Sequence, residues 1–173
     1  MIDKINNAFP DCIQNNCLSI VNHAAFKVFD RESACCFTCI APFPNSLCFF
    51  TVENNTAKPL NFLAIDRCLI IDDDNKKCDC AVFNDNEFHF VEIKTASTGV
   101  RGKRRRTAFE QLKNTIDVFY GKMDFSGLNV FAMICIGCAN VRPRTTSSQI
   151  ARAVELSNTY GIKLVEGNII PFN

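Results

Sequence analysis

The sequence predicts an α/β protein in which a mixed β-sheet is flanked by helices on both faces. The chain has 173 residues, which suits one domain with its own core better than two. Three strand-like segments follow one another with short turns, and two helix-like segments then alternate with further strands. Because 47% of the residues are apolar and 21% are charged, the composition is that of a globular protein.

The three consecutive strands are predicted where short apolar runs end in polar turns. The apolar runs cover residues 68–71, 78–83 and 88–94, and the turns at 72–76 and 84–86 separate them. Connections this short indicate an antiparallel meander, because a parallel pair needs a long crossover.

Two helices are predicted after the meander. The first covers residues 103–120, where apolar side chains recur at helical spacing: Phe109, Leu112, Ile116 and Phe119. The run at 130–137 is almost continuously apolar, as in a strand covered on both faces. Ser147 or Ser148 can cap the second helix, which ends near Tyr160 with Gly161 beyond it, before short strands at 162–165 and 169–172.

Residues 61–173 therefore form the predicted core of a single domain that spans residues 1–173. Residues 1–60 have a weaker pattern. Short helices are expected at 4–9 and 23–29, and a strand pair at 36–41 and 47–52. Their role is left unassigned.

The cysteines predict reduced thiols in a cytoplasmic protein. There are 11 of them at irregular spacing, the first residues do not form a signal peptide, and the apolar run at 130–139 is too short to span a bilayer. No membrane partner is therefore expected. The pairs Cys36/Cys39 and Cys135/Cys138 have the spacing of zinc ligands. Positions i and i+3 of a strand face opposite ways, so buried thiols are the favoured interpretation and a zinc site is the alternative.

The residues suited to chemistry lie at the ends of two neighbouring strands. Strand periodicity places Glu92 and Lys94 on one face of the segment 88–94, and a hairpin brings Asp79 towards them. Two carboxylates are ligands that Mg²⁺ prefers, and the Ile93 carbonyl is a further candidate ligand. Lys94 could orient an attacking water and neutralise charge on a phosphate. The alternative is a surface Glu–Lys pair on an edge strand.

Residues 66–137 resemble the core of the PD-(D/E)XK nuclease superfamily, which includes restriction enzymes, Holliday junction resolvases and phage-defence nucleases. In that pattern an Asp opens the second core strand, E-x-K ends the third, and a helix and a fourth strand follow. Asp79 matches the first position, and Glu92 and Lys94 match the E-x-K. Cys78 stands where the motif's name has Pro.

The resemblance implies a restriction-endonuclease-like fold and a Mg²⁺-dependent endonuclease, with Mn²⁺ as a possible substitute. The expected substrate is DNA, in restriction, defence or DNA processing. Gln111 on the next helix would approach the active site, and Glu32 is a candidate for the acidic residue that many members carry on an N-terminal helix. An RNA-directed nuclease and a catalytically silent module that binds nucleic acid or assists assembly both stay open as alternatives.

A basic run at the start of the first long helix predicts phosphate contacts. It consists of Arg101, Lys103, Arg104, Arg105 and Arg106, although the net charge of the chain is only +1. A solvated first helical turn is the alternative.

Because cutting both strands of a duplex usually takes two active sites, a homodimer or a second protein is expected. The apolar stretches 35–40 and 47–52 are the candidate interface, and their burial in the domain's own core is the alternative.

Overall fold

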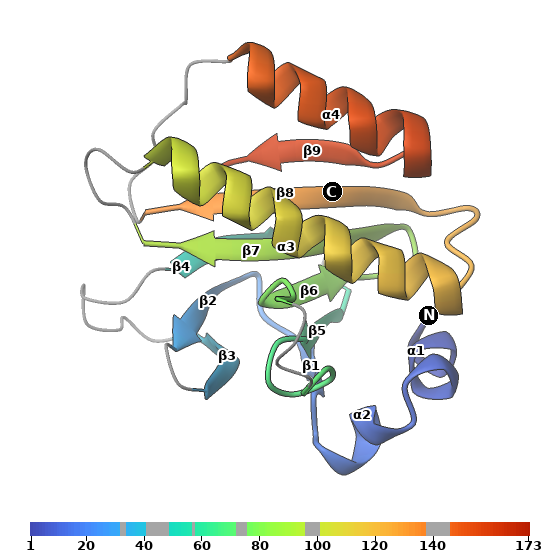
Figure 1. Cartoon of the computed structure of the whole chain (residues 1–173). Coiled ribbons are helices and arrows are strands. Elements are labelled where there is room, and N and C mark those ends of the chain that lie inside the picture. Colours follow the sequence, from blue (N-terminus) through green and yellow to red (C-terminus); the bar gives the residue numbers. More distant parts are fainter. Residues whose placement is uncertain (32–33, 41–48, 57, 72–75, 96–100, 138–145) are drawn as a thin grey trace.

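The computed structural model describes residues 1–31, 34–40, 49–56, 58–71, 76–95, 101–137 and 146–173 (Figure 1). Its helices in these ranges are α1 (Ile2–Ala8), α2 (Asp11–Gln14), α3 (Arg101–Lys122) and α4 (Ser147–Tyr160). Its strands are β1 (Leu18–Val21), β2 (Ala25–Arg31), β3 (Ala34–Cys39), β4 (Phe49–Asn54), β5 (Leu60–Ala64), β6 (Cys80–Phe83), β7 (Glu87–Lys94), β8 (Asn129–Ile136), β9 (Lys163–Glu166) and β10 (Ile169–Phe172). Buried apolar residues form a cluster that extends from Ile5 to Phe172.

The strands form two mixed sheets, which confirms the mixed α/β class. The larger sheet has the order β1-β5-β6-β7-β8-β9, in which β7, β8 and β9 are parallel and the other neighbours are antiparallel. The smaller sheet has the order β10-β4-β2-β3, with only β10 and β4 parallel. The predicted meander is present as β5, β6 and β7, so its first strand is Leu60–Ala64 rather than residues 68–71.

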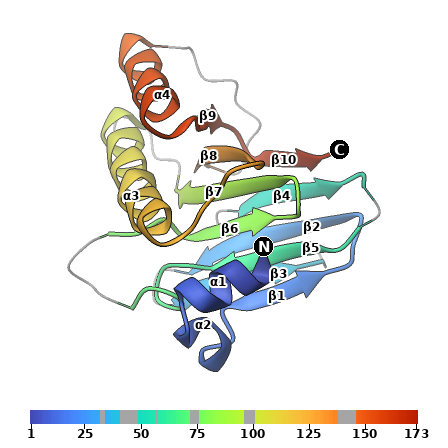
Figure 2. The ribbon, with the colours of Figure 1, turned by 90° about the vertical axis from the view of Figure 1, so that its right-hand side faces the viewer.

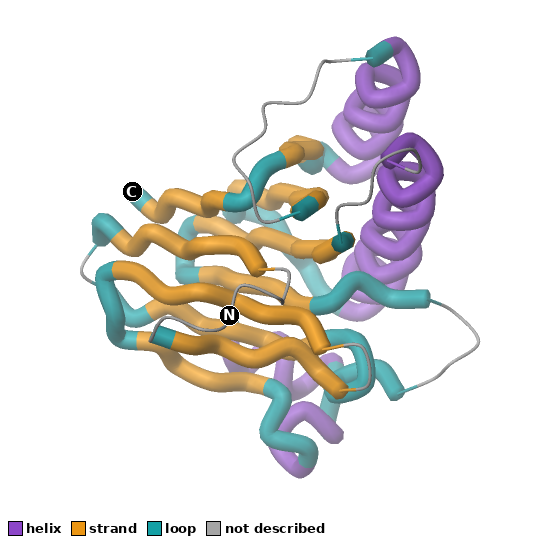
Figure 3. The backbone as a smooth tube through the Cα atoms, turned by 90° about the vertical axis from the view of Figure 1, so that its left-hand side faces the viewer, coloured by secondary structure: helices purple, strands orange, loops and turns teal. Residues whose placement is uncertain are grey.

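The two faces of β7 face different layers. Phe88 and Phe90 lie 6.2 and 5.1 Å from the Phe119 ring of α3, measured between ring centroids. His89 points the other way, and its ring lies 4.9 Å from that of Phe172 in β10. Figures 2 and 3 show α3 and α4 together on one side of the strands. The expectation of helices on both faces is therefore wrong for the described residues, because the smaller sheet covers the second face.

The long helices follow their sequence patterns closely. All four residues of the apolar stripe on α3 are buried, as predicted: Phe109, Leu112, Ile116 and Phe119. In α4 the N-cap is Thr146, one residue before the expected serines, and it forms a capping box with Gln149. Gly161 ends α4 with a φ of 71°, a left-handed conformation that favours glycine. No helix among the described residues has the length and apolar character needed to cross a bilayer.

The N-terminal third departs most from the predictions. The expected helix at 4–9 is present as α1, but the expected helix at 23–29 is strand β2, with Phe26 and Val28 buried on alternate positions. The expected strands at 36–41 and 47–52 correspond to β3 and β4. They flank β2 instead of pairing with each other. These differences arise because strand pairing depends on partners distant in sequence, which a local pattern cannot show.

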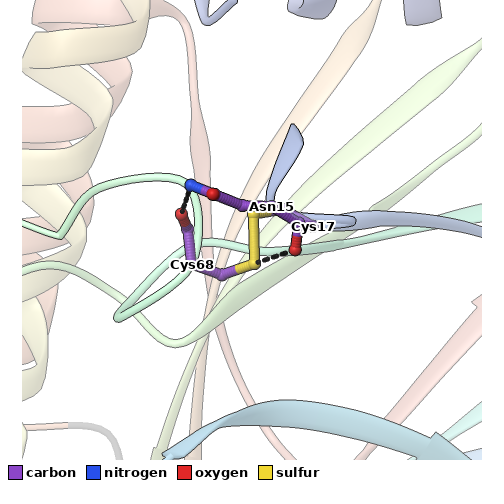
Figure 4. The surroundings of a disulfide bond; sticks show 3 residues. All are labelled: Asn15, Cys17 and Cys68. Carbon is purple, nitrogen blue, oxygen red and sulfur yellow. Dashed lines mark hydrogen bonds between the residues drawn. A yellow bond between two sulfur atoms is a disulfide. The ribbon is translucent and has the colours of Figure 1, made fainter. Parts of the chain in front are cut away.

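A disulfide joins Cys17, just before β1, to Cys68, with a Cα–Cα distance of 5.5 Å (Figure 4). The Asn15 side-chain amide also donates to the Cys68 carbonyl at 3.2 Å. Residues 68–71 thus belong to a cross-linked turn and not to the predicted strand. The expectation of reduced thiols is wrong for this pair, because a disulfide depends on spatial proximity and not on sequence spacing.

Candidate active site

The hairpin of β6 and β7 brings Asp79 to the end of β7. Cys80 pairs with Val91, so Asp79 lies beside the segment that contains Glu92 and Ile93. The Ile93 backbone N–H donates to Asp79 Oδ2 at 2.5 Å. The Asp79 backbone carbonyl in turn accepts from the N–H groups of Ile65 at 3.0 Å and Asp66 at 3.3 Å. Asp79 is therefore fixed through both its side chain and its backbone.

Glu92 is completely buried on the face of β7 that also carries Phe88 and Phe90. Lys94 Nζ forms an ion pair with Glu92 Oε1. Within the described part of the chain, Glu92 Oε2 has no hydrogen-bond partner. A buried carboxylate oxygen without a partner is costly, so this end of the sheet is chemically incomplete without a further cation or donor.

Burial and the charges of neighbouring carboxylates raise the pKa of both strand-end carboxyl groups. Burial, followed by the charge of Asp30, raises the pKa of Asp79 to about 7, although the Ile93 N–H and Lys94 oppose the shift. Burial and then the charge of Asp79 raise the pKa of Glu92 well above its ordinary value. Burial lowers the pKa of Lys94, but Glu92, Asp79 and Asp30 outweigh it, so the net shift is upward. These groups therefore share one electrostatic environment.

The smaller sheet adds two residues to this end of the hairpin. A carboxylate oxygen of Asp30 in β2, Cys36 Sγ in β3 and a carboxylate oxygen of Asp79 all lie within 4.8 Å of one another. The expected N-terminal acidic residue, Glu32, lies outside the described residues. The sequence interpretation missed Asp30 because it treated residues 23–29 as a helix. The available signal was an Asp that directly follows an apolar strand-like segment.

Helix α3 anchors the segment that leads into Asp79. Gln111 Nε2 donates to the Lys77 carbonyl at 2.9 Å, and Asn114 Nδ2 donates to the Lys76 carbonyl at 3.3 Å. Thr115 Oγ1 accepts from the Cys78 N–H at 2.8 Å. Gln111 was expected to act at the active site, but its amide nitrogen is bound to backbone. Asn114 and Thr115 also bind the backbone of the segment that leads into Asp79, and the sequence did not predict this role.

The basic run has mixed surroundings. Arg104 Nη1 donates to the Thr95 carbonyl and to Thr95 Oγ1, which places the start of α3 beside the end of β7. Arg106 pairs with Glu110 at 3.3 Å, and both side chains are largely exposed. Lys103 is exposed, and the Arg101 side chain lies outside the described part of the structure.

Arg105, by contrast, is occupied within the protein. It donates three hydrogen bonds of 2.7 to 3.0 Å to the two carboxylate oxygens of Glu166 in β9. Gln149 Nε2 adds a fourth at 2.7 Å. A cavity of about 770 Å³ lies beside this network, but its lining includes neither Asp79 nor Glu92. Its walls combine apolar and polar residues, most of them from α4 and β9, and include none of the carboxylates at the Asp79 site.

The residues at the strand end suit a divalent cation. Asp30 and Asp79 offer carboxylate oxygens in the close group with Cys36, and Glu92, which is not part of that group, adds a buried carboxylate at the end of β7. Carboxylate oxygens are the ligands that hard cations prefer. When all three are ionised, Lys94 balances one of the three charges, and a divalent ion would balance the other two. The unpartnered Glu92 Oε2 is the observation that argues most directly for such an ion.

Comparison with known proteins gives no match: no family model, no curated protein and no solved structure is significantly similar to the chain. The resemblance of residues 66–137 to a nuclease superfamily therefore remains a prediction from the motif.

Proposed function

We propose that this chain is a divalent-metal-dependent endonuclease that hydrolyses phosphodiester bonds in DNA on a restriction-endonuclease-like fold. The observation that carries the proposal is Glu92, a fully buried carboxylate at the strand end that Asp79 also occupies. One of its oxygens has no partner among the residues that the structure describes. The succession β5, β6, β7, α3, β8 supports it. Asp79 precedes the second of these strands, and Glu92 and Lys94 end the third.

The charges at this site favour binding of Mg²⁺ or Mn²⁺. Besides burial, the charge of Asp30 raises the pKa of Asp79 and the charge of Asp79 raises the pKa of Glu92, so the charged forms of these carboxylates repel in the absence of a cation. Asp79, Glu92 and the Ile93 carbonyl would hold the ion. When bound, it would lower the pKa of a coordinated water and stabilise negative charge on the phosphate oxygens.

The protein's own groups have distinct roles in this proposal. The Ile93 N–H fixes Asp79 Oδ2, so this carboxylate does not have to reorganise when the substrate arrives. Lys94 is partly exposed, so its ammonium can reach a water or a phosphate oxygen while it remains paired with Glu92. Gln111 and Thr115 act as positioning residues, because they hold the backbone of residues 77 and 78.

The start of α3 offers contacts for the DNA backbone. Arg104 bonds to Thr95, the residue after Lys94, so the first turns of α3 lie beside the proposed cleavage site. Lys103 and Arg106 are exposed there and can contact phosphates. Cleavage of both strands of a duplex would need a second active site, from another copy of the chain or from a second protein.

The test is incubation of the purified chain with Mg²⁺ or Mn²⁺ and a panel of duplex, single-stranded and branched DNA and RNA. Wild type should cleave a DNA substrate, and Asp79→Asn should not. Asp85→Asn, an exposed position in the turn at the other end of the same hairpin, is the matched control and should cleave normally. Binding without cleavage under every condition would favour a catalytically silent module that binds nucleic acid. Cleavage of RNA alone would mean that RNA, and not DNA, is the substrate.

A further inference from the structure

The two sheets meet at the candidate site, and each contributes possible metal ligands. Asp79 comes from the larger sheet, while Asp30 and Cys36 come from neighbouring strands of the smaller one. The three ligand atoms lie within 4.8 Å of one another, and Cys36 is only 5% exposed. A thiol at this place is not part of the D…E-x-K motif from which the nuclease hypothesis began.

We propose that Cys36 and Asp30 complete the coordination of the ion held by Asp79. The site would then select borderline-soft cations such as Zn²⁺ and Co²⁺ over Mg²⁺. This inference rests on the proposed metal site but not on its having nuclease activity. Sulfur is a poor ligand for Mg²⁺ and a good one for the later transition metals, so one thiolate among carboxylates changes which ion is bound.

The spacing of the three atoms suits a single ion. Zinc bonds to sulfur at roughly 2.3 Å and to carboxylate oxygen at roughly 2.1 Å, so neighbouring ligands of one tetrahedral ion lie roughly 3.4 to 3.6 Å apart. The ligand atoms of Asp30, Cys36 and Asp79 all lie within 4.8 Å of one another, so they would have to move closer by up to about 1.3 Å to reach that spacing. Ligation would release the Cys36 proton to solvent, because the thiolate is the metal ligand.

The charge balance gives a second, independent argument for a cation. Besides Asp30 and Asp79, the completely buried Glu92 acts on the same groups, and its Oε2 has no hydrogen-bond partner in the described ranges. Asp66 lies nearby but is paired with Arg67 at 3.8 Å. When all three carboxyl groups are ionised, the Lys94 ammonium balances one of their charges and a divalent ion would balance the other two.

Other thiols around Cys36 provide the controls. Cys39, its partner in the C-x2-C spacing, is not part of the cluster. Cys80 is completely buried and hydrogen-bonded to Cys36. Cys35, the preceding residue in β3, is half-buried and does not belong to the group. Because neighbouring strand residues point to opposite faces, Cys35 is the matched control for Cys36.

The experiment is a titration of the metal-free full-length chain with Co²⁺ under argon. Wild type should develop the near-ultraviolet charge-transfer absorption of a thiolate–Co²⁺ bond and saturate at one equivalent. Cys36→Ser should lose this band, and Cys35→Ser should keep it. Asp30→Asn should lower the affinity for Co²⁺ by about tenfold or more. Competition should show that Cys36→Ser reduces the preference for Zn²⁺ over Mg²⁺ by at least about tenfold.

Absence of the band in wild type, or its persistence in folded Cys36→Ser, would overturn the inference. If Cys36→Ser does not fold, X-ray absorption of Zn²⁺-loaded wild type decides, because a shell of oxygen and nitrogen without sulfur contradicts the proposal. The proposed nuclease is judged separately. A Co²⁺–thiolate band without DNA cleavage would support the thiolate metal site and contradict the proposed nuclease. Mg²⁺-dependent cleavage without the band would support the nuclease and contradict the thiolate site.

Discussion

Glu92 and Glu166 lie at strand ends near the start of α3, and the structure compensates their charges very differently. Glu166 receives three hydrogen bonds from Arg105 and one from Gln149, which together occupy both oxygens. Glu92 is more deeply buried, yet among the described residues its only partner is the Lys94 ammonium, which contacts one of its oxygens. Both carboxylates are paired with a cation, but only Glu166 has its hydrogen-bonding capacity filled.

The difference separates a structural ion pair from a candidate functional one. A satisfied bidentate pair holds α3, α4 and β9 together and requires nothing further. An under-compensated buried carboxylate is tolerated where a ligand completes the site, which is why strongly shifted pKa values cluster at functional sites. The comparison also removes Arg105 from the predicted phosphate contacts, because its guanidinium is already engaged.

The largest expected effect is on catalysis. Glu92→Gln should lower the rate of metal-dependent DNA cleavage by at least about a hundredfold, since it removes a charged ligand at the reacting centre. Glu166→Gln should leave that rate within a few-fold of wild type. Cleavage rates measured under saturating Mn²⁺ compare the two variants. Equal losses of rate in both would show that the difference between the surroundings of Glu92 and Glu166 has no functional meaning.

The next effect is a pH dependence of the metal-free protein. The pKa of Asp79 is raised to about 7 in the fold, against roughly 3.9 in an unfolded chain. The folded state therefore binds the proton more tightly, so the contribution of Asp79 to stability falls as pH rises through this window.

Denaturation in a chelator should measure this loss. The free energy of unfolding of wild type relative to Asp79→Asn should fall by about 2 to 3 kcal/mol between pH 5 and 8. A difference that is constant across this range would mean that Asp79 is not desolvated as described.

A third effect concerns folding stability. Glu166→Gln should lower the free energy of unfolding by about 2 kcal/mol, because it leaves the partly buried Arg105 without its charged partner. Glu92→Gln should not destabilise the metal-free protein, since it removes a charge that is already poorly compensated. Urea denaturation of both variants at neutral pH tests this, and a more damaging Glu92→Gln would reverse the assignment of roles.

The smallest effect is on the salt dependence of DNA binding. Replacing exposed Lys103 or Arg106 with Ala should reduce the slope of log affinity against log salt by about 0.9 for each lost phosphate contact. Arg105→Ala should not change the slope through a lost contact, although it should reduce stability. Fluorescence anisotropy at several salt concentrations distinguishes these variants, and a changed slope only in Arg105→Ala would contradict the assignment.

The sequence predicts well those elements whose patterns are local. Phe109 to Phe119 recur at helical spacing, and β7 alternates between residues that face α3 and residues that face the smaller sheet. The sequence also predicted that Asp79 lies beside the end of β7, because a short hairpin fixes the register of the two strands.

The remainder depends on contacts that local patterns do not contain. Strand β2 is defined by pairing with β3 and β4 on either side, and the apolar spacing of residues 23–29 resembles a helix when these partners are ignored. Asp30 was missed for this reason, whereas Cys36 was considered as a metal ligand only in a zinc site paired with Cys39. The Arg105–Glu166 pair joins residues that are 61 positions apart. The sequence therefore could not distinguish Arg105 from the other basic residues, and all five were predicted to contact phosphates.

The central claim is that the Glu92 end of the sheet binds a divalent cation and the Glu166 network does not, and isothermal titration calorimetry tests it most directly. Wild type and Glu166→Gln should each bind Mn²⁺ with a stoichiometry of at least one. Glu92→Gln should lose this binding while remaining folded by circular dichroism. Absence of Mn²⁺ binding in wild type, or undiminished binding in Glu92→Gln, would contradict the account.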